Sequence, residues 1–315
     1  MSLLFLSRAD VEALLEPGAL IEALADGFLA LTEGRVNAPD RIGLEVPGAG
    51  FLLAMPGHQP GGPIAVKLVS VFEGNAALGL PSHHALIGLF DGQTGVPRAV
   101  MDGAHITALR TAGGAALSAR LLARPESRVL AIVGAGVQGD AHLRLLPLVR
   151  DFAEIRIASG RPESAARLAS ADPRARAVPS IRAAVEGADV ICLCTSSAAP
   201  VVEAGWIAPG AHLTSVGFNP PGSELDPALI RASRVFVETR RAFQPPPAGA
   251  VECVGLDPDQ GAELGEVLAG RRPGRRSPDE ITLYKSMGHA MEDLVAAGLV
   301  YRRALATGRG VSVTL

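Results

Sequence analysis

Three glycines, Gly134, Gly136 and Gly139, have the spacing of the G-x-G-x-x-G motif of dinucleotide-binding proteins. They follow a short apolar run at residues 128–133 and precede a stretch with helical spacing. In a strand–turn–helix unit, the first glycine permits a tight turn, the second lets the backbone approach a pyrophosphate, and the third allows the helix to pack closely on the strand. The helix N-terminus then offers N–H groups to the anion. The motif therefore predicts a nicotinamide dinucleotide site, the alternative being a glycine-rich turn without a ligand.

The residues after the second expected strand bear on the choice of cofactor. NAD sites usually carry Asp or Glu at this point, where the carboxylate binds the ribose 2′-hydroxyl. Here a strand at residues 154–158 is followed by Ser159, Gly160 and Arg161, with no carboxylate. A guanidinium can pair with a 2′-phosphate. We therefore expect NADP(H), with NAD(H) as the alternative if Arg161 is an ordinary surface residue.

Lys67 is the charged residue of an otherwise apolar run at residues 64–69. A lysine in such a run is either buried and functional or placed at a sheet edge. Burial would lower its pKa, because desolvation disfavours the charged form. Lys67 is therefore a candidate acid or base.

Elements up to about residue 120 must position Lys67. A helical pattern at residues 10–31, punctuated by Pro17 and Gly18, is followed by β-like runs and an alanine-rich helix at 107–122. Residues 91–95 have the composition of a hairpin turn. Successive hairpins predict an antiparallel or mixed sheet. The expected strands are residues 50–55, 64–72, 85–90 and 97–101.

Residues from about 125 to 280 have a different organisation, since strands alternate with helices such as the one at 162–170. Such alternation predicts a parallel, doubly wound sheet with right-handed crossovers. A last helix at 289–306 follows the run 281–286, and we expect it to pack on the first zone. The expected parallel strands are residues 128–133, 154–158, 175–178, 189–195, 212–216 and 234–238.

Composition excludes several classes of protein. With 315 residues, 48% hydrophobic and 19% charged, the chain is expected to be globular, and a net charge of −3 gives no reason to expect nucleic acid or a membrane surface. The basic cluster at residues 271–276 is expected to be a solvated loop. Cys192 and Cys194 are expected to be small buried groups of one strand, since no metal partner lies nearby at ligand spacing. Without a signal-peptide pattern or a long apolar run, a cytoplasmic protein is expected.

Several ordered motifs resemble those of the ornithine cyclodeaminase/μ-crystallin family. They flank the glycine motif on both sides and cover nearly the whole chain. The matching blocks are residues 67–69, 81–84, 101–103, 107–111, 216–222 and 284–294.

The resemblance implies a homodimer with two domains in each chain and an α/β fold. A Rossmann-type, doubly wound parallel sheet at 123–283 would bind the dinucleotide. A discontinuous α+β domain, residues 1–122 together with 284–315, would bind the substrate and form the dimer. The enzymes of the family act on small molecules with an α-carboxylate next to an amine or imine carbon.

The family's carboxylate clamp maps onto Arg41, Lys67 and Arg110, the alternative for Lys67 and Arg110 being a structural ion pair. A guanidinium fork suits a planar carboxylate, and fixing the carboxylate aims the α-carbon at the nicotinamide. His83 and His84 are further candidate acid/base groups, although a histidine satisfied by the backbone is commoner. The positions at which family members contact the cofactor are Ser82, Thr111, Val137, Gln138, Thr195, Val216 and Ser286.

Asn219 departs from the ornithine cyclodeaminases, which carry an aspartate at the matching position. An amide forms hydrogen bonds but cannot exchange a proton as a carboxylate does. We therefore expect an NAD(P)H-dependent reductase that converts a cyclic ketimine acid, Δ1-pyrroline-2-carboxylate or Δ1-piperideine-2-carboxylate, into proline or pipecolate, or a related amino-acid dehydrogenase. Lys67 and Asn219 would be its catalytic residues. The alternatives are an ornithine cyclodeaminase and a non-catalytic, NADPH-dependent ligand-binding protein.

Overall fold

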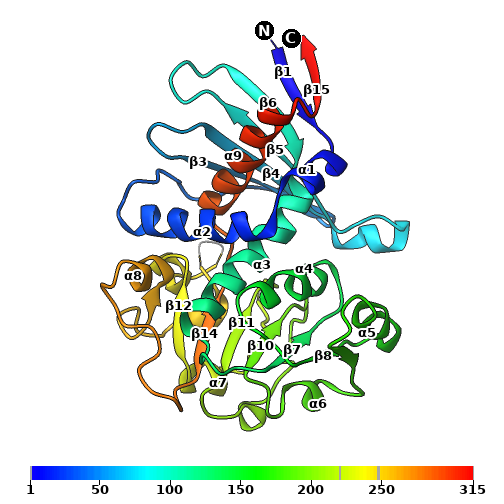
Figure 1. The fold of residues 1–315 in the computed structure, drawn as a ribbon, viewed down its shortest axis with the longest axis vertical. Helices are drawn as coiled ribbons and strands as arrows, with labels where there is room; N and C mark the ends of the chain where they lie inside the picture. The colour runs from blue at the N-terminus through cyan, green and yellow to red at the C-terminus, as the bar shows by residue number, and fades with distance from the viewer. Residues whose placement is uncertain (1, 220, 247–248, 315) are drawn as a thin grey trace. The chain divides into compact units, whose positions relative to one another are not determined.

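A computed structural model describes residues 2–219, 221–246 and 249–314, so Pro220 of the expected 216–222 block lies outside the described residues. The chain divides into two compact units (Figure 1). Unit 1 comprises Met1–Arg110 and His289–Leu315, and unit 2 comprises Thr111–Gly288. The chain crosses between the units inside one helix, α3 (Gly103–Leu122).

Unit 1 contains a seven-stranded mixed sheet, as the hairpin pattern predicts. Only the β1–β6 pair is parallel, and the turn between β5 and β6 is held by Asp91, which accepts the N–H groups of Gln93 and Thr94. The short outer strands β1, β2 and β15 were not expected from the sequence. In spatial order the strands are β15 (Val311–Thr314), β1 (Ser2–Leu6), β6 (Pro97–Asp102), β5 (His83–Phe90), β4 (Ile64–Val71), β3 (Gly50–His58) and β2 (Ile42–Val46).

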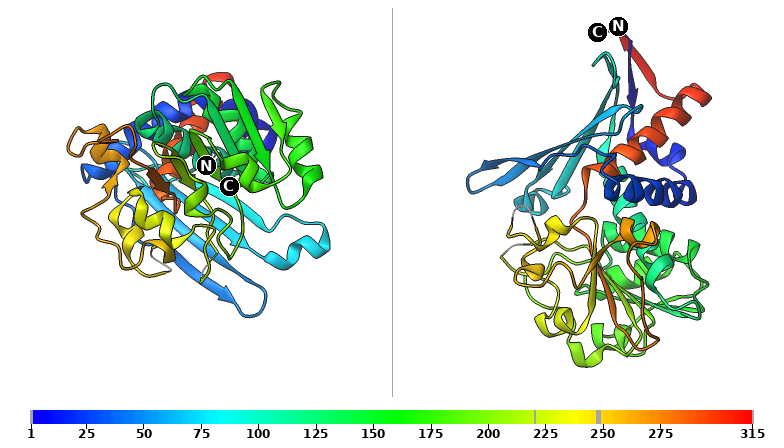
Figure 2. Two further views of the ribbon diagram at one scale, coloured as in Figure 1. Left: turned by 90° about the horizontal axis from the view of Figure 1, so that it is seen from below. Right: turned by 90° about the vertical axis from the view of Figure 1, so that its left-hand side faces the viewer.

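Helices α1 (Arg8–Leu14), α2 (Pro17–Thr32) and α9 (Ala290–Thr307) lie on one face of this sheet (Figures 1 and 2). The helical pattern at residues 10–31 is thus two helices. Pro17 opens the second, because its fixed φ and missing N–H suit the first turn of a helix. As expected, the last helix packs on the first zone.

Unit 2 contains an eight-stranded sheet in which every pair is parallel, which confirms the Rossmann-type prediction. The strand order reverses between β7 and β10, and ligands of such sheets bind at this point, beyond the carboxyl ends of the strands. In spatial order the strands are β13 (Ala262–Glu263), β12 (Arg234–Val237), β14 (Thr282–Lys285), β11 (His212–Ser215), β10 (Val190–Leu193), β7 (Val129–Val133), β8 (Glu154–Ala158) and β9 (Ala175–Ala177).

Helices pack on both faces of the parallel sheet. One face buries Val133, Leu193 and Leu213 against side chains of α6 (Ile181–Val185) and α7 (Pro227–Ala232). On the opposite face, His212 bonds to Ser118 of α3. The remaining helical segments are α4 (Val137–Leu145), α5 (Pro162–Ala169), α8 (Leu264–Leu268) and the 3-10 turns Glu73–Leu78, Leu146–Leu148, Ala204–Trp206, Arg240–Phe243 and Val251–Cys253. Within the described part of the chain, no helix is both long and apolar enough to cross a membrane.

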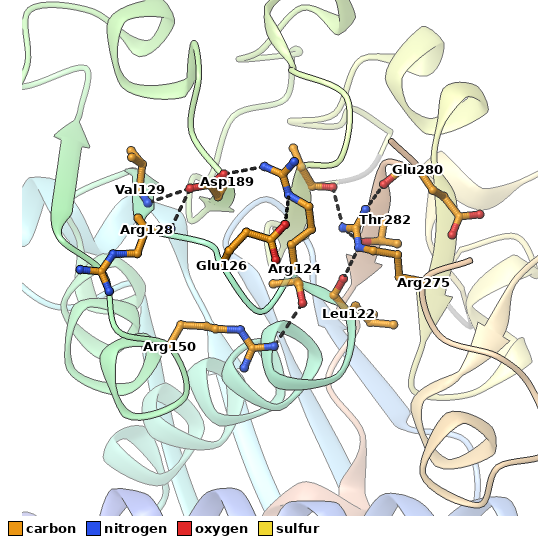
Figure 3. Close-up of polar contacts among 12 residues, drawn as sticks. Leu122, Arg124, Glu126, Arg128, Val129, Arg150, Asp189, Arg275, Glu280 and Thr282 are labelled. Atoms are coloured by element: carbon orange, nitrogen blue, oxygen red, sulfur yellow. Dashed lines mark hydrogen bonds and ion pairs between the residues drawn. The ribbon is translucent and has the colours of Figure 1, made fainter. Parts of the chain in front are cut away.

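Two arginines satisfy the carbonyl groups at the C-terminus of α3 (Figure 3). Arg150 donates to the carbonyl oxygens of Arg120 and Ala123, at 2.9 and 3.1 Å. Arg275 donates to the Leu122 carbonyl at 2.7 Å and also bonds the ends of two strands. Basic groups suit a helix C-terminus, where carbonyls lack partners within the helix. The expectation that residues 271–276 form a solvated loop is therefore wrong for Arg275.

Replacing Arg275 with Met is expected to lower the free energy of unfolding by about 2–3 kcal/mol, because buried carbonyl oxygens lose their donors. The matched control is Arg276→Met, whose side chain is 61% exposed and pairs with Glu280. It is expected to cost less than about 1 kcal/mol. Urea unfolding of both variants measures the difference, and equal losses would contradict a capping role for Arg275.

Candidate functional site

Two of the predicted substrate-binding residues meet in unit 1, around one carboxylate. Lys67 projects from β4 and its Nζ lies 2.7 Å from Oδ2 of Asp293. The other oxygen of Asp293 lies 3.2 Å from Nε of Arg110. Arg110 also donates from Nη1 to Glu292 at 3.0 Å. Two cations and two anions from three elements thus form one cluster.

The four side chains of this cluster are almost completely buried. The side chains of Lys67 and Asp293 are 2% and 1% exposed, and those of Arg110 and Glu292 are 6% and 0% exposed. Burial lowers the pKa of Lys67 to about 8, with a further decrease from the positive charge of Arg110, while Asp293 opposes the shift. Lys67 therefore titrates close to neutral pH, as expected for a functional buried lysine rather than for one at a sheet edge.

Arg41 directly precedes β2, and sheet register relates it to Lys67. Ile42 pairs with Ala54, while Met55 pairs with Lys67. Extending the β2–β3 register by one residue brings Arg41 opposite Met55. Arg41 and Lys67 then occupy the same row of the sheet on either side of β3, about 10 Å apart. Directly opposed residues have their side chains on the same face of a sheet, so the side chain of Arg41 shares the face of Lys67.

The glycine loop of unit 2 has the features that a pyrophosphate site requires. Gly134 has φ +106°, a conformation that other residues rarely adopt, and a Cβ on Gly139 would clash with the Gly134 carbonyl. At Gly136 an added Cβ would meet open space. Gly136 is the N-cap of α4 and has no side chain to satisfy the first N–H groups. These residues fit a dinucleotide phosphate, with Val137 and Gln138 in the first helical turn.

The residues predicted to determine the preference between NADP(H) and NAD(H) follow β8. Ser159 Oγ accepts the N–H of Arg161 at 3.3 Å, so the turn is closed by its own side chain. Arg161 is exposed and is the N-cap residue of α5.

Glu224, buried to 1% exposure, joins the loops that follow β10 and β11. It accepts hydrogen bonds from the N–H and the hydroxyl of Thr195, at 2.9 and 2.6 Å. Its second oxygen accepts from the hydroxyl of Ser215 and the N–H of Gly217, both at 2.8 Å. Thr195 and the loop around Val216, both predicted to contact cofactor, are therefore held by one carboxylate.

Two further buried carboxylates hold the loop after β14. Glu238 accepts from the hydroxyl of Ser286 at 2.9 Å and from the N–H groups of Met287 and Gly288. Glu252 pairs with Lys285 at 3.0 Å, and Lys285 also donates to the Gly217 carbonyl. Buried glutamates therefore hold the loops that follow β10, β11 and β14 through hydrogen bonds and an ion pair.

The other predicted residues occupy loops and helix starts. Asn219 donates from Nδ2 to the carbonyl of Ser196 at 2.8 Å, which orients its amide. Ser82, in unit 1, has its hydroxyl 2.9 Å from Nδ1 of His83. Thr111 is buried in α3, directly after Arg110.

Five carboxylates that hold these sites were not predicted, namely Glu224, Glu238, Glu252, Glu292 and Asp293. Glu292 and Asp293 lie at the third and fourth positions of α9, where flanking apolar residues point into the core. Two adjacent charges inside a helix with an apolar stripe are the signal that could have found them. Glu224 and Glu238 carry no such signal, since each lies at the end of a loop or strand of mixed composition.

The cysteines are free thiols, and no cluster of His, Cys, Asp or Glu suited to a metal occurs among the described residues. Cys192 is buried in β10, and burial raises the pKa of its thiol to about 12, as for a small apolar group. Cys194 lies beyond the end of β10 and is only partly buried, so the expectation of two cysteines within one strand is wrong.

Comparison with known proteins identifies the family of this chain. A model of the ornithine cyclodeaminase/mu-crystallin family matches residues 1–308. The chain belongs to this family. The ketimine reductase mu-crystallin of Mus musculus is 38% identical over 305 residues, covering 94% of this chain and 96% of that protein.

Two solved structures of the family are similar throughout. The Δ1-pyrroline-2-carboxylate reductase of Thermococcus litoralis, in complex with NADH and L-proline, has a TM-score of 0.93 and 35% identity, covering 99% of this chain and all of that one. An archaeal alanine dehydrogenase dimer with bound NAD has a TM-score of 0.91 and 31% identity, with both chains fully covered. The predicted family and fold class are confirmed.

Gly136→Ala is expected to separate cofactor binding from stability. Its φ of −91° is accessible to alanine and no protein atom lies near the new methyl, so the melting temperature should stay close to wild type. The methyl occupies space reserved for the pyrophosphate, so the Kd for NAD(P)H should rise at least about tenfold. Fluorescence titration measures this, with Gly205→Ala as the control, since Gly205 is exposed, lies outside the proposed cofactor site and also has open space for a methyl group. Unchanged affinity would contradict the assignment.

Proposed function

We propose that this protein is an NAD(P)H-dependent reductase of small cyclic ketimine acids, such as Δ1-pyrroline-2-carboxylate or Δ1-piperideine-2-carboxylate, with related open-chain amino-acid dehydrogenation as a neighbouring activity. The observation that carries this proposal is that Lys67 and Arg110 are buried together and both pair with Asp293. A substrate with a planar carboxylate next to an imine carbon suits such a pair of cations. Relatives named as ketimine and pyrroline-2-carboxylate reductases support it.

The residues divide the work between recognition and proton handling. Bound NAD(P)H supplies the hydride that adds to the imine carbon. Lys67 and Arg110, with Arg41, hold the substrate carboxylate and so orient the carbon. The ring nitrogen must end with one proton more than a neutral imine carries. A substrate that binds as iminium brings this proton, and Lys67, with a pKa of about 8, is able to give it to a neutral imine.

Asn219 bonds the ring nitrogen or a water in this proposal. Its amide does not exchange protons at neutral pH, and ornithine cyclodeamination requires proton transfers at several steps. The residue therefore favours the reductase over the lyase.

The proposal is tested by the oxidation of NADPH and NADH with each of the two cyclic imines. Net cofactor consumption with formation of proline or pipecolate is expected. Release of ammonia from ornithine without net cofactor change would support the lyase instead, and cofactor binding without any turnover would support a ligand-binding protein.

We propose NADP(H) as the preferred cofactor, on the basis of Arg161 and the missing carboxylate after β8. Arg161→Ala is expected to raise the KM for NADPH about tenfold or more, because the 2′-phosphate loses a charge-assisted partner. The KM for NADH should change little. Steady-state kinetics with both cofactors measures the ratio, and equal effects on the two would contradict a role for Arg161 at the 2′-phosphate.

We also propose a homodimer that forms through the bare face of the unit 1 sheet. Outward-pointing apolar side chains of β2–β5 share this face, opposite the helices, since sheet register aligns Ile42, Ala54, Leu68 and Leu86 in one row. Contiguous exposed apolar patches mark interaction sites. The exposed members are Ile42 (67%), Leu44 (61%), Leu52 (36%), Leu68 (42%) and Leu86 (53%).

Leu68→Glu is expected to produce a monomer, because a charge would be buried at the centre of this face. Light scattering after gel filtration measures the mass, and Leu305→Glu provides a control at an exposed leucine of α9. A wild-type monomer, or a dimer that survives Leu68→Glu, would contradict the proposed interface.

A cytoplasmic location stays a prediction from the sequence.

A further inference from the structure

Lysine is rare in this chain, and both lysines occupy buried ion pairs. Of the 29 basic residues that are Lys or Arg, only Lys67 and Lys285 are lysine. Their side chains are 2% and 0% exposed, and each pairs with a carboxylate that is itself nearly buried, Asp293 and Glu252. Arginine occupies every other basic position. A compact ammonium with three rotatable donors is not equivalent to a planar guanidinium.

The two buried lysines differ in their surroundings. Lys285 faces Glu252 and neutral acceptors, Ser215 Oγ and the Gly217 carbonyl. Lys67 shares its carboxylate with a second cation, Arg110, so two positive charges converge on Asp293. Glu292 pairs with Nη1 of Arg110 and accepts the His289 N–H at 2.6 Å. Asp293 is thus the carboxylate that bridges the two cations.

We propose that Asp293 is a positioning residue for the imine reduction, which holds Lys67 and Arg110 at a fixed separation and keeps Lys67 protonated for the substrate carboxylate. This inference rests on the proposed function. Asp293 acts through the two cations and does not itself contact substrate. Because it lies in the first turn of α9, while Lys67 lies on β4 and Arg110 in α3, it also ties the three elements together.

The direction of the electrostatic effect follows from the groups that face Lys67. Arg110 from α3 lowers the pKa of Lys67, whereas Asp293 and Glu292 from α9 raise it. Removing the charge of Asp293 leaves burial and Arg110 opposed by Glu292 only, so the pKa of Lys67 falls below about 8. Lys67 is charged only below its pKa. The pH range in which it binds a carboxylate therefore contracts toward lower pH.

The test compares the pH dependence of kcat/KM for wild type, Asp293→Asn and Asp293→Glu, with Asp26→Asn as a control at an exposed position of α2. The alkaline limb of the wild-type profile is expected near pH 8, and that of Asp293→Asn at least about one pH unit lower. At neutral pH, KM for the imine should rise at least about tenfold, with a smaller change in kcat. Asp293→Glu keeps the negative charge, so the alkaline limb of its kcat/KM profile should return to near pH 8. A limb and a KM that stay at wild-type values in Asp293→Asn would overturn the inference.

A second readout does not need turnover. A chain labelled with [13Cε]lysine has only two lysine side-chain signals, and Lys67→Arg identifies the one from Lys67. Its titration midpoint should lie near pH 8 in wild type and lower in Asp293→Asn, and Asp293→Glu should return it. An unchanged midpoint would overturn the inference. If the wild-type chain reduces no imine, the proposed function fails, and this titration still decides whether Asp293 sets the charge of Lys67.

Discussion

The ion pair between Lys67 and Asp293 constrains the rest of unit 1. Taking a charge out of water is costly, and removing one partner of a buried pair leaves an uncompensated charge, which typically costs about 3–5 kcal/mol. The chain balances two cations with two anions, so the cluster as a whole is neutral. Sheet register brings Lys67 to the covered face of β4, and α9 brings its carboxylates to meet it. In the proposed function, substrate recognition would therefore use charges that the fold has already paired.

Unit 2 uses buried carboxylates in a similar way. Glu224 and Glu238 accept hydrogen bonds from loops at the carboxyl edge of the sheet, and Glu252 pairs with Lys285 at the end of β14. A carboxylate satisfied by several N–H and O–H donors is stable when buried. The loops that carry Thr195, Val216 and Ser286 are therefore rigid before any cofactor arrives. Preorganisation of this kind lowers the entropy lost on binding.

The features of the fold and the site that depend on neighbouring residues can be predicted from the sequence. The glycine loop, the parallel sheet and the central hairpins follow from short-range patterns, and each was found close to its predicted bounds. The strands β1, β2 and β15, and β13 and β14 of the parallel sheet, were not predicted. All five are short, and all but β14 lie at or near a sheet edge. The partners of Arg110 could not be predicted, since 182 residues separate it from Glu292. Only the folded chain brings such residues together.

The central claim is that the Lys67–Arg110 pair recognises a carboxylate next to the imine carbon. The most direct measurement compares kcat/KM for Δ1-pyrroline-2-carboxylate with that for 1-pyrroline, which lacks the carboxylate, in wild type and in Lys67→Met. The account predicts that wild type prefers the acid by about a thousandfold or more, since the carboxylate gains charge-assisted hydrogen bonds that 1-pyrroline cannot form, and that Lys67→Met loses most of this preference. Similar rates with both imines in the wild-type protein would contradict it.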